Sequence, residues 1–297
     1  MTNDIVTKGK QDFADGIHTE LRQQQNKSRS VGIISGNLTS NSRSEVSGVS
    51  ARVYKDGVYG FSSMAEISDN AARSVLGAAT ENAKFMASRA GRPASIAPVA
   101  TDAVVRDCNV SDPEQKGYTE FAKELDGYIE KKYKNLSGRG VYIRCDSMEK
   151  LIAVSDGADG HTIIPRSYVY IRMTAETPSG VPVELFEPFG GFGTFDTVFT
   201  SPESLYEKVD GVYERIMKKR EGVYAEAGER TCILSGTLAG MLAHEAVGHT
   251  VEADLVLGGS VAAHCLGKQV ASPIVNLTDF AYDAFGAPCP LPVWLDD

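Results

Sequence analysis

The chain has 297 residues, of which 42% are hydrophobic and 23% are charged. This composition excludes a disordered or fibrous chain, and the length leaves room for more than one hydrophobic core. The formal net charge of -9 argues against nucleic acid as a partner, because phosphate binding needs a clustered basic face.

Compartment signals in the sequence favour the cytoplasm. The first residues contain no apolar run behind a basic start, and no segment approaches the ~18 consecutive apolar residues of a membrane-spanning helix. The five cysteines are widely spaced and form no Cys-x-x-Cys pair, so a disulfide framework is not expected. We therefore expect a cytoplasmic chain that does not contact a membrane.

Residues 1–100 are interpreted as an N-terminal α+β domain built from a strand hairpin and a helix. The run Glu45 to Phe61 is strand-like, and Asp56-Gly57 between alternating apolar residues predicts a primed turn. A helix opened by Ser68 follows and closes at Ala90 to Pro93; its inward residues are expected to be Ala72, Val75, Leu76, Ala79, Ala83 and Met86. Helical spacing before the hairpin predicts an earlier helix, carried by Val6, Phe13, Ile17 and Leu21.

Residues 101–226 are expected to form a middle α+β domain, an antiparallel meander with flanking helices. The alternation from Val141 to Phe186 has period two and is broken at Asp156-Gly157 and at Pro178 to Gly180. The first flanking helix is predicted from Asp112 as N-cap to near Gly138, with Pro113 at its first position and Phe121, Leu125 and Tyr128 facing inward. The second is capped at Ser201-Pro202 and carries Leu205, Val209, Val212 and Ile216.

Two loops resemble ligand sites and are interpreted otherwise. The segment Pro188 to Thr194 is glycine-rich but lacks the Gly-Lys-Ser/Thr ending of a phosphate loop, so we expect a flexible loop near a substrate groove. The segment Asp156 to His161 resembles a calcium loop without the later bidentate glutamate, and a turn is the better interpretation.

The third part, 227–297, opens with an expected strand at Cys232 to Leu234 and continues into the helix that contains His-Glu-Ala-Val-Gly-His. Histidines four residues apart lie about 40° from each other around a helix, whereas His244 and His249 are five apart, or about 140°. A π-type turn would restore their alignment, and Gly248 would make such a distortion sterically easy. We therefore predict a widened turn at Ala246 to Gly248.

The residues around this pair suit a metal-dependent hydrolase. Glu245 is placed to take a proton from a metal-activated water. Glu252 and Asp254 could orient the histidines by accepting their second N–H groups. The alternative is that His244 and His249 are ordinary helix histidines paired with local carboxylates.

The segment AHEAVGHTVEAD closely resembles the signature of the TldD/PmbA metallopeptidase family, in particular its metal-bearing TldD-type members. The segments ARVYKDGVYGFSS and SDGADG are similar to the hairpin and the middle domain of that family, once also described as modulators of DNA gyrase. The resemblance implies His244 and His249 as zinc ligands, Glu245 as general base, and hydrolysis of peptides or unfolded polypeptides. It further implies a homodimer or a heterodimer with a paralogous subunit, and a closed groove in which extended chains pair as an added strand.

The sequence departs from the family at the remaining metal ligand. In the family this ligand is a cysteine far beyond the motif, in a C-terminal β-rich domain, and none of the five cysteines here matches it. Catalytic zinc normally has three protein ligands. His264 and Cys265 are chemically suitable substitutes, although Cys265 also suits a small buried hydrophobe.

We therefore expect a TldD-type peptidase whose C-terminal β-rich domain, 227–297, is truncated and carries the motif helix. Two other interpretations remain. One is a non-catalytic or incomplete subunit that acts as a scaffold for peptides or a partner. The other is a regulator that binds nucleic acid or gyrase, which the net charge of -9 opposes.

Overall fold

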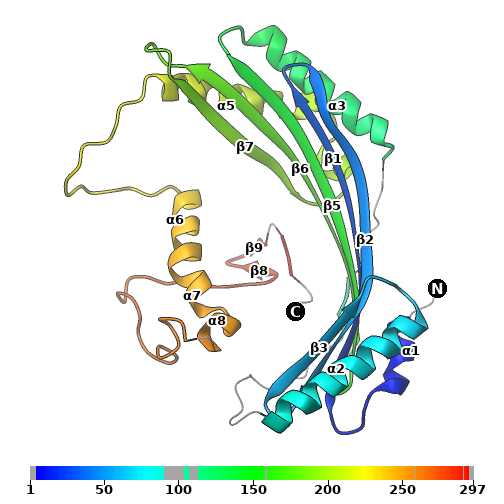
Figure 1. Ribbon diagram of the computed structural model, residues 1–297. Coiled ribbons are helices and arrows are strands. Elements are labelled where there is room, and N and C mark those ends of the chain that lie inside the picture. Colours follow the sequence, from blue (N-terminus) through cyan, green and yellow to red (C-terminus); the bar gives the residue numbers. More distant parts are fainter. Residues whose placement is uncertain are drawn as a thin grey trace.

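The computed structural model describes residues 5–89, 104–106, 113–157, 159–257, 259–289 and 291–293. One curved sheet of seven strands dominates it (Figure 1), with the order β3-β2-β1-β5-β6-β4 and with β7 also paired to β6. Neighbouring strands are antiparallel except β4, which runs parallel to β6. The strands are β1 (His18–Ile34), β2 (Asn37–Lys55), β3 (Val58–Met64), β4 (Val104–Arg106), β5 (Gly138–Val154), β6 (Gly160–Glu176) and β7 (Pro182–Phe192).

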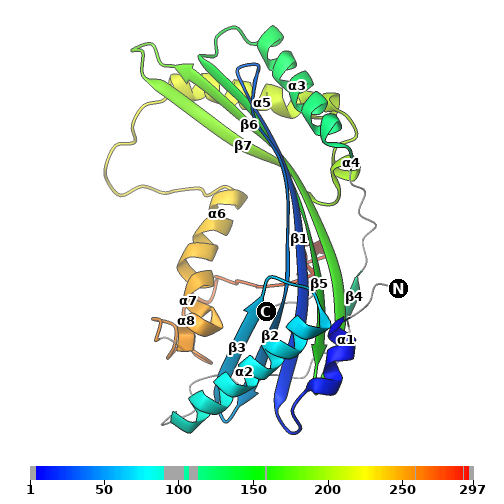
Figure 2. The ribbon, with the colours of Figure 1, turned by 45° about the vertical axis from the view of Figure 1, so that its right-hand side comes forward.

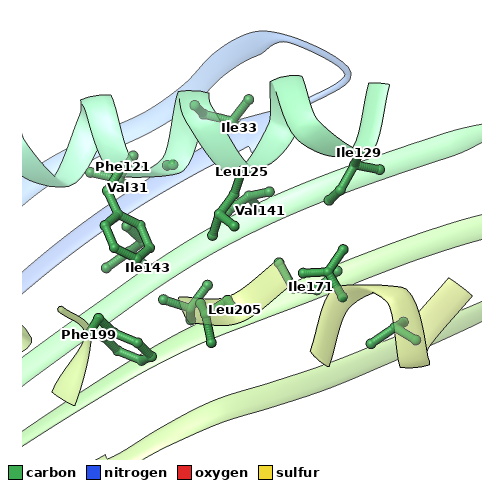
Figure 3. Packing of buried hydrophobic residues seen from close by; sticks show 14 of the residues in the cluster. Val31, Ile33, Phe121, Leu125, Ile129, Val141, Ile143, Ile171, Phe199 and Leu205 are labelled. Carbon is green, nitrogen blue, oxygen red and sulfur yellow. The ribbon is translucent and has the colours of Figure 1, made fainter. Parts of the chain in front are cut away.

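Helices cover the convex face of this sheet. On its concave side lie α6 and the residues after it (Figures 1 and 2). The convex face carries two hydrophobic clusters, because alternate strand residues point toward the helices. One cluster lies under α2, and the larger lies under α3 and α5 (Figure 3). The helices are α1 (Ile5–Gly9), α2 (Asp69–Arg89), α3 (Gln115–Lys132), α4 (Phe195–Val198) and α5 (Tyr206–Arg220), with 3-10 turns at Lys10–Asp12 and Pro202–Leu205.

Several predicted elements are confirmed. Asp56 and Gly57 have φ of 47° and 85°, as a primed turn requires, and they join β2 to β3. The strands β5, β6 and β7 form the predicted antiparallel meander. The helix after Ser201 buries all four of its expected residues, Leu205, Val209, Val212 and Ile216.

The predicted N-terminal helix is wrong beyond its first turns. After α1 and one 3-10 turn the chain enters β1, which contains Leu21. Spacing of four residues satisfies period two as well as the helical period, and the inward neighbour Thr19 is as buried as Leu21. The polar stretch from Gln23 to Ser30 belongs to the same strand.

Two helix predictions need correction in detail. Met86 is half exposed, because the buried residues of α2 end at Ala83. The helix α3 ends at Lys132 rather than near Gly138, since the backbone of Tyr133 is already extended. Asp112 and the segment Ala90 to Pro93 lie outside the described residues.

The segment Pro188 to Thr194 is not a flexible loop. Its residues up to Phe192 belong to β7 and pair with β6. A Cβ at Gly190, where φ is +132°, would lie 2.0 Å from the carbonyl oxygen of Ser167. The glycine therefore permits a close approach between two strands rather than mobility.

The part that contains the motif leaves the sheet after α5. The strand predicted at Cys232 to Leu234 is absent from the described structure, and Ile233 is almost fully exposed. The helices α6 (Gly236–Ala243), α7 (His249–Val251) and α8 (Ala253–Leu257) follow, then the short strands β8 (Asp283–Ala284) and β9 (Ala287–Pro288). No helix in the described parts of the chain is long and apolar enough to cross a membrane.

Candidate metal centre

Ser235 begins the helix that carries the motif. Its Oγ accepts a hydrogen bond of 3.3 Å from the backbone N–H of Leu238, so it satisfies one of the free donors of the first turn. The small residues that follow form α6 and lead without a break into His244.

The predicted widened turn is confirmed. Residues His244–Gly248 form one π turn, and the backbone N–H of His249 donates to the carbonyl oxygen of His244. This i to i−5 bond places the two histidines above each other, which a regular α-helix would not do. Their imidazole centroids lie 4.4 Å apart at an interplanar angle of 66°.

Gly248 does not have the steric role that the sequence predicts for it. Its φ and ψ are -49° and -60°, which any residue can adopt. A Cβ at this position would lie 3.6 Å from Nδ1 of His244, an ordinary contact distance. The π turn therefore does not need a glycine for steric reasons.

The turn gathers His244, Glu245 and His249 into one group. Each offers a ligand atom, and these atoms all lie within 4.8 Å of one another. The Nε2 of His249 is 3.7 Å from a carboxylate oxygen of Glu245. All three side chains are exposed, so a water molecule and a substrate can reach them.

Glu252 fixes the orientation of His249. One of its carboxylate oxygens lies 2.7 Å from Nδ1 of that histidine. If Nδ1 carries the proton and donates it to this carboxylate, the lone pair of Nε2 is free on the side of Glu245. Helical structure breaks at Glu252, whose ψ is 136°, and α8 begins directly after it.

Thr250 is a supporting residue that the sequence interpretation missed. Its hydroxyl donates to the carbonyl oxygen of Val247 at 2.9 Å. The carbonyl oxygen of Thr250 in turn accepts a hydrogen bond of 2.7 Å from Ser260. A threonine directly after the second histidine is the signal, because threonine hydroxyls bond carbonyls three or four residues back.

The other candidate residues do not join the group in the described structure. His264 and Cys265 lie in a turn after α8, and neither belongs to the group of potential ligands around His244. Asp254 lies in α8, but the placement of its side chain is outside the described structure. Among the described residues, Cys145, Cys232, Cys265 and Cys289 are free thiols.

The donor set fits a divalent transition metal. Imidazole nitrogen is a preferred ligand of zinc and its neighbours, and a carboxylate beside the site is a suitable proton acceptor. His244, Glu245 and His249 provide two imidazoles and one carboxylate, which leaves coordination positions for water and for further ligands.

Family models match nearly the whole chain. Domain 1 of the PmbA/TldA metallopeptidases matches residues 19–87, their central domain matches 108–234, and their C-terminal domain matches 227–288. The chain belongs to the PmbA/TldD family. The family's C-terminal domain model covers the π turn and its histidines.

Relatives of this family member are named metalloproteases. A metalloprotease of Methanocaldococcus jannaschii is 32% identical over 47% of this chain and 30% of its own length. A metalloprotease of Methanothermobacter thermautotrophicus is 23% identical over 93% of this chain and 62% of its own length. A zinc metalloprotease TldD homolog of Saccharolobus solfataricus is 35% identical over 22% of this chain and 15% of its own length. These matches span less than two thirds of each relative.

Solved structures show the same fold. A protein of Bacteroides thetaiotaomicron described as a modulator of DNA gyrase has a TM-score of 0.65 at 13% identity, over 90% of this chain and 60% of its own. TldE of Thermococcus kodakarensis has a TM-score of 0.53 at 14% identity, over 73% of this chain and 46% of its own.

Proposed function

We propose that this chain provides the metal-binding motif of a zinc-dependent metallopeptidase that hydrolyses peptides or unfolded polypeptides. The observation that supports this most directly is the π turn, because it aligns His244 with His249 and leaves Glu245 beside them. Ordinary helix histidines would not require such a rare turn. The name of the Saccharolobus relative supports zinc as the metal.

The residues divide the chemistry between them. A divalent metal bound here would supply a Lewis acid that lowers the pKa of water toward neutrality. Glu245 would accept the proton of the attacking water and donate it to the departing amine, as a general base and then a general acid. Glu252 would hold the proton on Nδ1 of His249 and so keep Nε2 available.

A scaffold function is the alternative, and one observation favours it. The described ligand group contains only two histidines, whereas catalytic zinc normally has three protein ligands. On this alternative the chain binds peptides or a partner and hydrolyses nothing.

The surface of the motif helices supports assembly with another chain. Leu238, Met241 and Leu242 on α6 are each about half exposed, and clustered apolar side chains of this kind mark interaction sites. We propose that the chain forms a homodimer or a heterodimer with a paralogous subunit. We also propose that this assembly is located in the cytoplasm.

Elemental analysis together with a peptidase assay tests the function. We expect close to one zinc per purified chain, lost in His244→Ala and retained in His264→Ala, which serves as the matched histidine control. Glu245→Gln should keep the metal and lose hydrolysis of an unfolded casein, whereas Glu226→Gln, an exposed glutamate before α6, should keep both. Zinc-loaded protein without hydrolysis would favour the scaffold, and His244→Ala with full metal content would contradict the site.

A further inference from the structure

The concave face of the sheet carries a cluster of aromatic and arginine side chains that the metal site does not use. Alternation puts six residues of β5, β6 and β7 on the face opposite α3 and α5. We call this cluster the aromatic-arginine face: Tyr142, Arg144, Tyr168, Tyr170, Arg172 and Phe186.

The rings of this face are packed side by side, with Phe186 exposed and the three tyrosines partly exposed. Tyr170 stacks on Phe186 at 5.2 Å and 15°, and Tyr168 lies 6.0 Å from Tyr170. Phe186 is 53% exposed although it lies within β7. Exposed, adjacent aromatic rings offer flat apolar surfaces to a ligand.

Two glycines make room for Tyr142 on this surface. A Cβ at Gly140 would lie 2.9 Å from the hydroxyl oxygen of Tyr142, and a Cβ at Gly32 would lie 3.3 Å from its ring. The ring therefore lies over side-chain-free backbone of β1 and β5. Glycine inside a strand weakens it unless something must approach closely, and here the approaching group is a ring of this face.

The face is cationic although the chain is acidic. Beside Arg144 and Arg172, alternation puts one more arginine, Arg166, and the two carboxylates Asp146 and Glu184 on the same side of the sheet. Asp146 pairs with Arg166 at 2.7 Å, while Glu184 is 3.8 Å from Nε of Arg172.

Arg144 is exposed, and the structure gives it no partner among the described residues. A guanidinium in this position suits a carboxylate of a ligand.

We propose that the aromatic-arginine face holds polypeptide substrates that are rich in acidic and aromatic side chains. The proposal rests on the proposed peptidase function and adds the class of substrate. The concave face lies on the side of the sheet where α6 and α7, which flank the π turn, are also found (Figures 1 and 2), so a chain held on this face would lie on the side of the metal centre. Exposed rings would stack on its aromatic side chains, and Arg144 would pair with its carboxylates.

Single-stranded nucleic acid also uses stacking and arginine, but the face suits it less well. Asp146 and Glu184 lie among the arginines and would repel phosphates, and the net charge of -9 adds to that repulsion. A peptide carries fewer charges per residue than a nucleic acid, and its carboxylates can lie opposite the guanidinium of Arg144. The polypeptide is therefore the occupant that the charges favour.

Fluorescence anisotropy with a labelled, unstructured peptide of Glu, Phe, Ser and Gly tests this inference. EDTA is present, so neither metal nor hydrolysis affects the result. We expect Arg144→Ala, Tyr170→Ala and Phe186→Leu each to raise Kd about fivefold to tenfold. Arg73→Ala and Phe85→Ala on α2 are the matched controls, since Phe85 is also 53% exposed, and they should change Kd less than about twofold. A peptide with Lys in place of Glu should bind more weakly.

Three results of the binding experiments and of sedimentation would overturn the inference. The first is that variants of the face bind the peptide as the controls do. The second is that a single-stranded oligonucleotide binds this face more tightly than the peptide. The third is that the variants alter sedimentation of an oligomer and leave peptide binding unchanged.

The proposed function fails independently of this inference. Absence of zinc in the purified protein would overturn the function while binding in EDTA stands. If the variants of Arg144, Tyr170 and Phe186 all hydrolysed the peptide of Glu, Phe, Ser and Gly as the wild type does, only the inference about the aromatic-arginine face would be overturned.

Discussion

A carboxylate oxygen of Glu252 lies 2.7 Å from Nδ1 of His249. Glu252 follows His249 by three residues and is the C-cap of α7, and side chains three residues apart lie on the same face of a helix. A hydrogen bond to the second nitrogen of a ligating imidazole fixes its tautomer and raises its basicity. Glu252 therefore supports the metal site from the C-terminal end of the same helix.

Replacement of Glu252 by alanine should weaken metal binding without unfolding the chain. Loss of such a supporting carboxylate typically costs about 10-fold to 100-fold in metal affinity. Competition with a chromophoric zinc chelator measures this change, and Glu226→Ala is the matched control. An unchanged affinity would mean that His249 binds metal through Nδ1 or does not bind it.

The length of the π turn makes a second prediction. Deletion of Val247 would place the histidines four residues apart, where a regular α-helix aligns them, so zinc binding should persist. An alanine inserted after Val247 would place them six apart, or about 120° from each other around a helix, and binding should be lost. The zinc stoichiometry of the deletion and insertion variants tests this prediction, and circular dichroism checks that both fold. Zinc bound by both variants would show that His249 is not a ligand.

Local signals were sufficient for much of the fold. Asp56-Gly57 predicted its turn because only a few residue types accept two consecutive positive φ values. The distortion at Gly248 was predicted because the spacing of His244 and His249 conflicts with the helical period. In both cases the residue types or their spacing in the sequence are enough to predict the local backbone geometry.

Other features depend on neighbours that are distant in sequence. The sequence around Gly190 predicts a flexible loop, because the role of this glycine depends on the carbonyl oxygen of Ser167 in the adjacent strand. The spacing of Leu21 fits both the helical period and the strand period, and only the pairing of β1 with β2 and β5 decides between them. The curvature that leaves the aromatic-arginine face open is likewise a property of the whole sheet.

In the candidate site, too, residues that are close in sequence could be related to one another from the sequence, whereas distant ones could not. His244, Glu245, His249 and Glu252 are close in sequence, so helical geometry relates them. His264 and Cys265 were suggested by chemistry alone, without a constraint on position, and the described structure does not bring them to the group. Ligands contributed by distant segments cannot be located by spacing.

The ion pair between Arg139 and Asp126 should be important for stability. Asp126 is 4% exposed, and Arg139 binds it through two hydrogen bonds of 2.9 and 3.2 Å. Arg139→Ala would leave a buried carboxylate without its partner, which should lower the free energy of unfolding by about 3 kcal/mol. Urea denaturation measures this change, and Arg73→Ala on the exposed side of α2 should change it by less than about 0.5 kcal/mol.

A matched double substitution tests the cause. Replacing both Asp126 and Arg139 by apolar residues of similar size removes the unpaired charge and should recover most of the lost stability. Equal destabilisation by the double variant would show that packing, and not the buried charge, accounts for the effect.

Asp210 should make stability depend on pH in the acid range. Partial burial raises the pKa of this carboxyl, but hydrogen bonds from Lys132, Tyr128 and Tyr133 outweigh burial and hold it below the ordinary value of 3.8. Because the folded-state pKa is the lower one, ionised Asp210 stabilises the fold above the ordinary value, and this contribution is lost as pH falls through the folded-state pKa.

Substitution Asp210→Asn should therefore lower the urea midpoint at neutral pH and have little effect near about pH 2. Midpoints of wild type and variant, measured between about pH 2 and pH 7, give the difference directly. Asp15→Asn, an exposed position, should follow the wild type throughout. A difference that stays constant down to the lowest pH would mean that Asp210 acts through the shape of its contacts and not through its charge.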